Sequence, residues 1–142
     1  MGLFPRTRDI NLVRIDEILS QASDRLRMMR LIIKDVEEAL IETRSQEAMI
    51  LHQARQLRRE AADAERLQGD LTEDARHALA VDREDLARRA LNEKYDSARK
   101  VDGLRQRAHI LEAKVDAIAA EVLRLEEVLA AIKDRSRSKP AA

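Results

Sequence analysis

Two long heptad repeats, separated by one short polar segment, constrain the fold of this chain more than any other feature. The first repeat alternates steps of three and four residues from Leu26 to Ala78, and thirteen of its sixteen positions are apolar. The second runs from Ala87 to Ile132 in the same way, with twelve apolar residues at fourteen positions. A repeat of about 3.5 residues held this long without a frame shift is typical of a supercoiled helix seam.

The connection between the repeats, residues 80–85, is short, so the two helices are expected to lie antiparallel. The predicted fold is therefore all-α: an N-terminal amphipathic helix followed by a long antiparallel coiled-coil hairpin. We expect the hairpin to span residues 24–134, with arms at about 24–80 and 83–134. Counting about the 82–83 turn pairs Leu57 with Ala108. Five seam positions are polar and are expected to set the register: Thr43, Glu47, Gln68, Lys94 and Ser97.

Composition agrees with a long solvated helical protein. Charged residues make up 38% of the chain, Gly and Pro number three and two, and Phe4 and Tyr95 are its aromatic residues. Residues 31–80 carry seven basic and eleven acidic groups, and residues 81–142 carry fourteen and twelve, so the arms differ in sign, which fits antiparallel pairing. The sequence has no coherent basic face, which argues against a nucleic-acid partner.

Residues 1–22 are expected to form a separate unit. On a helical wheel Phe4, Leu12, Ile15, Ile18 and Leu19 share one face of roughly 120°. Two interpretations stay open. The helix either lies at a membrane interface, with basic groups near lipid headgroups, or packs on the hairpin or on a neighbouring chain. The residues predicted to bind membrane are Leu3, Phe4, Arg6, Arg8, Leu12, Arg14, Ile15, Ile18 and Leu19.

The ends of the expected helices carry polar signals. Ser23 or Asp24 could cap the first arm. Asp82 could accept the free N–H groups of the following turn, and acidic residues after it would lie near a positive helix end. A tip that also contacts a partner is the alternative. The tip residues considered are Asp82, Glu84, Asp85, Leu86 and Arg88. Residues 135–142 are expected to be a short basic disordered tail.

The motifs of catalysis are missing from the sequence. His52, His77 and His109 do not form a zinc-binding pattern, and no Gly-rich phosphate loop is present. Without Cys, a disulfide or a Cys-ligated metal site is excluded. We therefore expect no enzymatic activity, no cofactor and no metal. No apolar run approaches the roughly 20 residues of a transmembrane helix, and no signal peptide is seen, so a cytoplasmic location is expected.

Three stretches resemble the phage-shock protein A family, which also includes the plastid vesicle-inducing protein. They are the start Met1-Gly2-Leu3-Phe4-x-Arg6, the run Arg55-Gln56-Leu57-Arg58, and the tip Arg83-Glu84-Asp85-Leu86-Ala87-Arg88-x-Ala90-Leu91. The resemblance covers about residues 1–134. Family members usually have a Pro after the acidic step between the first two helices, whereas Ser23-Asp24-Arg25-Leu26 has none. One continuous helix from Pro5 to Leu79 is therefore a further alternative.

The resemblance implies a bacterial relative of the ESCRT-III membrane-remodelling proteins, peripheral at the inner face of the plasma membrane. It implies binding of stressed or anionic bilayer through the N-terminal helix, self-association into polymers and a role in envelope stress. The alternative is a soluble regulator whose hairpin binds and inhibits an AAA+ transcription activator. The family normally continues for two or more further helices, so we expect a short form that ends after the hairpin.

Overall fold

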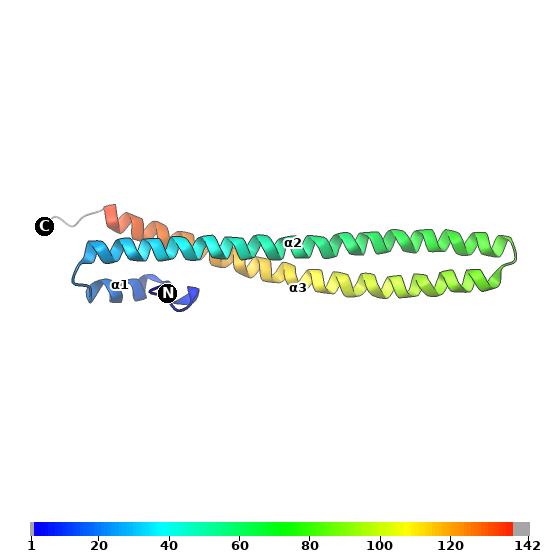
Figure 1. Cartoon of the computed structure of the whole chain (residues 1–142), viewed down its shortest axis with the longest axis horizontal. Helices are drawn as coiled ribbons and strands as arrows, with labels where there is room; N and C mark the ends of the chain where they lie inside the picture. Colours follow the sequence, from blue (N-terminus) through cyan, green and yellow to red (C-terminus); the bar gives the residue numbers. More distant parts are fainter. Residues whose placement is uncertain (1, 138–142) are drawn as a thin grey trace. The chain divides into compact units, whose positions relative to one another are not determined.

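The computed structural model describes residues 2–137, and every regular element in this range is helical (Figure 1). A 3₁₀ helix η1 (Thr7–Asp9) and a short α1 (Leu12–Ser20) precede two long helices, α2 (Arg25–Ala80) and α3 (Glu84–Arg137). The long helices pack against each other as a hairpin, which confirms the predicted fold class.

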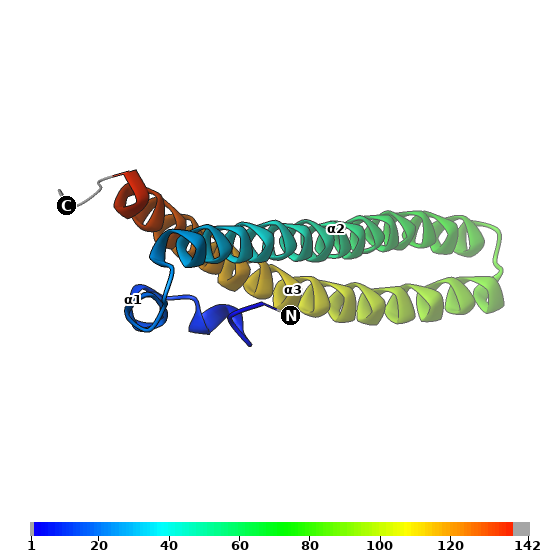
Figure 2. The same ribbon diagram turned by 60° about the vertical axis from the view of Figure 1, so that its left-hand side comes forward.

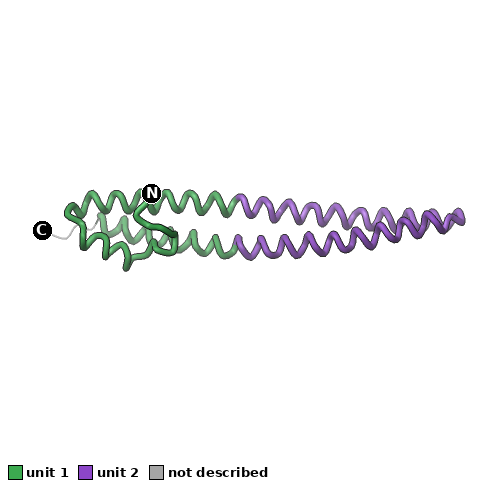
Figure 3. The backbone as a smooth tube through the Cα atoms, turned by 60° about the horizontal axis from the view of Figure 1, so that its bottom comes forward, with its two compact units in different colours: residues 1–48, 116–142 green, residues 49–115 purple. Residues whose placement is uncertain are grey.

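The chain divides into two compact units, coloured in Figure 3. Unit 1 comprises residues 1–48 and 116–142, and unit 2 comprises residues 49–115. Unit 1 therefore holds the N-terminal segment, the start of α2 and the end of α3. Unit 2 holds the turn of the hairpin and the adjoining parts of both long helices.

In unit 2 a narrow seam of mostly small apolar residues joins α2 to α3. One cluster contains Ala61, Ala64, Val101 and Leu104, with Leu57 packed against it. A second, nearer the turn, contains the alanines at positions 75, 78 and 87, with that at position 90 beside them. All of these residues occupy predicted seam positions, so the heptad register is confirmed in this unit.

The polar seam residue Ser97 is buried without losing its hydrogen bond. Its side chain is on α3, and its Oγ donates to the backbone carbonyl of Ala64 on α2 at 2.9 Å. Since an unpaired buried hydroxyl would cost about 1–3 kcal/mol, this bond makes a polar group acceptable at a buried position. It also joins two particular turns of the helices, as a residue that sets the register should.

In unit 1 the seam is wider than the heptad predicts. Ile32 and Val128 are buried beside the expected positions, whereas Leu26, the first expected seam residue, is 56% exposed. The repeat begins in practice at Met29. The physical reason is a third layer: the N-terminal segment and α1 also pack here, so α2 and α3 must present a broader apolar face.

The expected N-terminal helix is shorter than predicted, because Asn11 interrupts it. Asn11 is extended (φ −147°, ψ 160°), and its side-chain oxygen accepts from the backbone N–H of Arg14 at 2.8 Å, which starts α1 at Leu12. Pro5 therefore lies before η1 and outside α1. The alternative of one continuous helix is also wrong. Residues 21–24 separate α1 from α2, and Asp24 caps α2 by accepting from the N–H of Arg27 at 3.1 Å.

Backbone hydrogen bonds at the C-terminal end of α2 form the turn of the hairpin. The N–H of Arg83 donates to the carbonyl of Ala78 at 2.8 Å, and the N–H of Asp82 donates to that of Leu79 at 3.1 Å. These two bonds form a Schellman motif in which Asp82 takes the left-handed conformation, φ 58°. The prediction that Asp82 begins the next helix is therefore corrected. It ends α2, because Asp is one of the few non-Gly residues that tolerate this geometry.

The end of α3 also differs from expectation. The helix continues to Arg137, so residues 135–137 do not belong to a disordered tail, and residues 138–142 lie outside the described range. Arg135 donates to Asp16 of α1 at 2.5 Å, and basic residues in the last turn interact favourably with the helix dipole.

Ion pairs cross between the long helices in both directions. In unit 1, Arg44 of α2 reaches Glu126 of α3 at 2.9 Å. In unit 2, Arg58 of α2 reaches Glu112 at 2.6 Å, whereas Arg105 of α3 pairs with Glu65 of α2. The pairs therefore do not follow the difference in net charge between the arms. All are well exposed, so solvent screens them and each contributes little to stability.

Replacing Leu104 by Ala should lower the free energy of unfolding by at least about 2 kcal/mol, because the side chain is 5% exposed inside the narrow seam. The matched change Ile110→Ala removes an apolar side chain that is 56% exposed on the same helix, and should cost less than about 0.5 kcal/mol. Urea unfolding followed by helical circular dichroism measures both. Equal losses would show that the seam register is wrong.

Asp82→Gly should raise the free energy of unfolding by about 0.5–1 kcal/mol, since Gly adopts the left-handed conformation without the strain that a Cβ introduces. Asp82→Ala keeps a Cβ and loses the polar group, so it should lower stability. Urea unfolding of the two variants tests the geometry of the turn, and an Ala variant as stable as the Gly variant would contradict it.

Candidate membrane-binding segment and hairpin tip

The apolar face predicted for the N-terminal helix exists, and in this structure it packs on the hairpin. Ile15 and Leu19 of α1 are 0% and 3% exposed, and Ile10, just before the helix, is 2% exposed. They share a core with α2 and α3 in unit 1, and α1 lies beside these helices in Figures 1 and 2. The half-buried members of the predicted set flank this core: Leu3, Phe4, Leu12 and Ile18.

The structure therefore shows the contact of the second interpretation, in which the helix packs on the hairpin. Insertion of the same residues into a bilayer stays a prediction. The two contacts use one surface, so the face must leave the hairpin before it can enter a membrane.

The predicted basic residues lie outside this core. The Arg6 side chain is 64% exposed and lies 3.8 Å from Asp9, and that of Arg14 is 53% exposed and lies 3.2 Å from Glu17. Arg8 is also exposed. The polar side of α1 is thus mixed in charge, and Val13, 71% exposed, adds an apolar group to it.

One backbone anchor holds the start of the segment. The N–H of Leu3 donates to Oδ2 of Asp35 on α2 at 2.7 Å. Gly2 lies against the same carboxylate, so closely that a Cβ added at Gly2 would be 3.0 Å from that oxygen. The absence of a side chain at Gly2 therefore permits the approach to Asp35.

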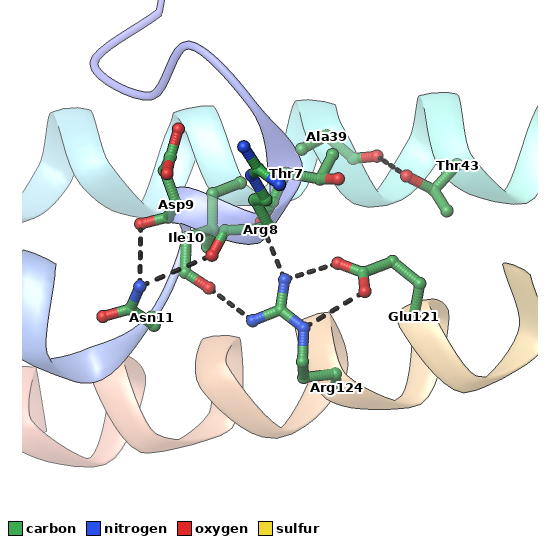
Figure 4. A network of polar contacts seen from close by, with 9 residues as sticks. All are labelled: Thr7, Arg8, Asp9, Ile10, Asn11, Ala39, Thr43, Glu121 and Arg124. Carbon is green, nitrogen blue, oxygen red and sulfur yellow. Dashed lines mark hydrogen bonds and ion pairs between the residues drawn. The ribbon is translucent and has the colours of Figure 1, made fainter. Parts of the chain in front are cut away.

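A second anchor is the guanidinium of Arg124 on α3 (Figure 4). Its Nη1 donates to the carbonyl of Ile10 at 2.6 Å, and its Nη2 donates to the carbonyl of Thr7 at 2.7 Å. Glu121, one turn earlier on α3, receives two further bonds from the same group and orients it. Arg124 thus binds both ends of the turn that contains η1.

Asn11 shapes the chain between this turn and α1 (Figure 4). Its amide nitrogen donates to the carbonyls of Arg8 at 3.4 Å and Asp9 at 3.3 Å, while its oxygen caps α1. The carbonyls of Thr7 and Ile10, at the two ends of this turn, bind Arg124 of α3.

An open cavity of about 560 Å³ lies beside the anchored segment in unit 1. Phe4, Ile10, Ala39 and Ile118 form apolar parts of its wall, and the acidic part of the wall includes Asp35, Glu38, Glu42 and Glu121. The cavity is open to solvent, so the N-terminal segment leaves part of the hairpin surface beside it uncovered.

The predicted tip residues are brought together at the turn in unit 2 and are exposed. Arg83 donates to both carboxylate oxygens of Asp85 at 3.2 and 3.3 Å, and this pairing lowers the pKa of Asp85. Glu84 lies 3.9 Å from Arg88. Glu84 and Asp85 occupy the first turn of α3, as predicted, where negative charge is favourable.

Beside the turn lies an open groove of about 520 Å³ with a mainly apolar wall. Val81, 68% exposed, and Leu86, 39% exposed, contribute to it together with Leu71, Ala78 and Ala90. No described residue cluster in the chain resembles a metal site of three or more His, Asp or Glu side chains. Among residues 2–137 there is also no helix with the length and hydropathy needed to cross a membrane.

Sequence reasoning missed Arg124, Asp35 and Asn11. Asn11 had a readable signal, since Asn directly before an apolar helical pattern is a common helix cap. Arg124 and Asp35 had none. Each is one charged residue among many on a solvated helix, and each bonds to backbone groups more than 30 residues away.

The geometry of the tip predicts a pH effect. Pairing lowers the folded-state pKa of Asp85, so the pair stabilises the hairpin above the ordinary Asp pKa and the effect is lost as pH falls through the lowered value. Carbon-detected NMR titration should show a midpoint for Asp85 below that of an ordinary Asp, and Arg83→Gln should raise it. An unchanged midpoint in the variant would mean that the pair does not form in solution.

Comparison with known proteins places these features in context. The family model described as the PspA/IM30 family matches residues 2–138. A relative named phage shock protein A homolog, from Deinococcus radiodurans, is 25% identical over 126 residues. That alignment covers 89% of this chain and 56% of the relative, so the chain spans little more than half of that protein's length.

Proposed function

Because the chain belongs to the PspA/IM30 family, we propose that it is a phage-shock-type protein that binds anionic or packing-stressed bilayer through residues 2–20. One observation carries this proposal. The most apolar face of the N-terminal segment belongs to a helix that has its own cap at Asn11 and is separated from α2 by the non-helical residues 21–24. Such a helix can leave the hairpin without unwinding α2.

The energetics of binding are a competition between two contacts. Burying Phe4, Ile15 and Leu19 in a bilayer would contribute roughly 4.5–9 kcal/mol at about 1.5–3 kcal/mol each. The same residues already lie in or beside the core of unit 1, so only the difference between the two environments drives binding. Arg6, Arg8 and Arg14 would each add attraction of about 1 kcal/mol at an anionic surface, reduced by salt.

The proposal extends to the location and assembly of the protein. Binding through α1 would make it peripheral at the inner face of the plasma membrane, where it would support membrane remodelling and the response to envelope stress. The long exposed flanks of the hairpin would allow self-association. No enzymatic step or cofactor is part of this function.

A second candidate function rests on the hairpin tip. The groove beside Val81 and Leu86 offers apolar surface next to charged groups, as partner-binding surfaces commonly do. This would fit a regulator whose hairpin binds and inhibits an AAA+ transcription activator. Substitutions at the tip would then remove inhibition, whereas substitutions in α1 would not.

Co-sedimentation with vesicles tests the first proposal. The variant Phe4→Ser, Leu12→Ser, Ile18→Ser changes the half-buried part of the apolar face and leaves the buried Ile15 and Leu19 in place. We expect wild type to bind anionic vesicles and neutral vesicles much less, and the triple variant to bind at least about tenfold more weakly. Helical circular dichroism should show that the variant keeps its hairpin.

Val13→Ser is the matched control, because Val13 is exposed on the opposite side of α1. It should bind vesicles as wild type does. Full binding by the triple variant, or equal losses in the triple variant and the control, would reject the apolar face as the membrane contact.

A further inference from the structure

We propose that Arg124 is an autoinhibitory latch, which holds residues 2–20 on the hairpin and so keeps the apolar face of α1 covered. The proposal rests on the proposed function, because the covered face is the one that would enter the membrane. It adds a closed state and the residue that maintains it.

The bonding of Arg124 is suited to a latch. Its two donors reach the carbonyls of Thr7 and Ile10, which begin and end the turn preceding α1. Hydrogen bonds from a charged donor are stronger than neutral ones, and one planar group that holds two carbonyls also fixes their orientation. Because Ile10 is itself in the core, the latch fixes the point at which the segment enters its apolar contact.

The environment of Arg124 allows this contact to open. The side chains of Arg124 and Glu121 are 35% and 30% exposed, so water can replace the carbonyls as partners when the segment leaves. The nearby open cavity means that the segment is not tightly packed along its whole length. Other polar contacts of the segment include the Leu3–Asp35 bond at its start and the Arg135–Asp16 pair on α1.

Opening would therefore be a shift between two populations. In the closed state α1 contributes Ile15 and Leu19 to the core of unit 1. In the open state the hinge at residues 21–24 lets α1 move while the seam between α2 and α3 remains. A bilayer favours the open state by accepting the exposed face, and removal of the latch favours it without a bilayer.

The first test uses the free protein and needs no membrane. In Arg124→Gln, amide hydrogen exchange of residues 12–20 should be at least about tenfold faster than in wild type, since the closed state loses its strongest polar contact. Amides of α2 in unit 2, around Ala61 and Ala64, should remain protected, which separates release of α1 from general unfolding. Arg124→Lys, which keeps the charge and one donor direction, should fall between the two.

Arg58→Gln is the matched control, because it removes the same charge and a two-bond contact, to Glu112, within unit 2. Exchange of residues 12–20 should stay at the wild-type rate in this variant. An unchanged rate in Arg124→Gln, or an equal increase in both variants, would overturn the latch.

The second test locks the segment in the closed state. The chain has no Cys, and a Cβ at Gly2 would lie 3.5 Å from Cγ of Asp35, so Gly2→Cys with Asp35→Cys places two thiols within reach of a disulfide. The oxidised form should bind anionic phosphatidylglycerol vesicles less than its own reduced form, and Arg124→Gln should bind more than wild type. Equal binding by oxidised and reduced forms, where the reduced form binds, would overturn a closed state that covers the face.

The two tests separate failure of the latch from failure of the membrane function. Faster exchange in Arg124→Gln supports the latch even where no variant binds vesicles, in which case the membrane function is rejected. The latch would be rejected, and the membrane function would stand, under a different result. In that result wild type binds vesicles, and Arg124→Gln shows the wild-type exchange rate and the wild-type vesicle binding.

Discussion

The seam between α2 and α3 is the contact on which the rest of the structure depends. In unit 2 it consists largely of alanines, with Leu71, Val101 and Leu104 among its larger buried members, and its clusters include no residue of α1. Small side chains bury little apolar area, so the pairing of the two helices must depend more on their register than on the size of the buried side chains. The Ser97 bond to the carbonyl of Ala64 contributes to that register, because a shifted pairing would leave the hydroxyl buried and unpaired.

The sequence was sufficient to predict the two arms, the turn and the seam of unit 2, because a strict repeat encodes one interface between two neighbouring helices. It failed where a third layer intervenes. A heptad cannot show that Ile32 and Val128 are buried, since they belong to a core that also contains residues of α1. It also could not show that Asp82 ends one helix instead of starting the next, because Asp suits both positions and the backbone conformation decides between them.

The sequence predicted only part of the candidate site, because a sequence pattern identifies an apolar face but not what the face contacts. Amphipathic periodicity identifies a face, so Ile15 and Leu19 were recognisable as members of one apolar surface. Periodicity says nothing about what covers that surface, and a bilayer and a protein core select the same residues. The polar groups that bind the N-terminal segment to the hairpin in the structure, Asp35 and Arg124, contact backbone atoms, which leave no mark in the sequence.

The apolar core that contains residues of α1 is separate from the apolar clusters of unit 2. The two apolar clusters of unit 2 include no residue of α1, whereas the cluster of unit 1 takes Ile15 and Leu19 from it. Exposure of α1 would therefore leave the clusters of unit 2 intact and weaken only the core that α1 completes.

A helix that were essential to the whole seam could not serve as a movable membrane contact, because its release would unfold the hairpin. In the structure, α1 is held by local contacts within unit 1, and under the proposed function a bilayer would have to exceed their combined free energy. Asp35 and Arg124 bind backbone atoms of the N-terminal segment and Arg135 pairs with Asp16, and all of these contacts lie within unit 1.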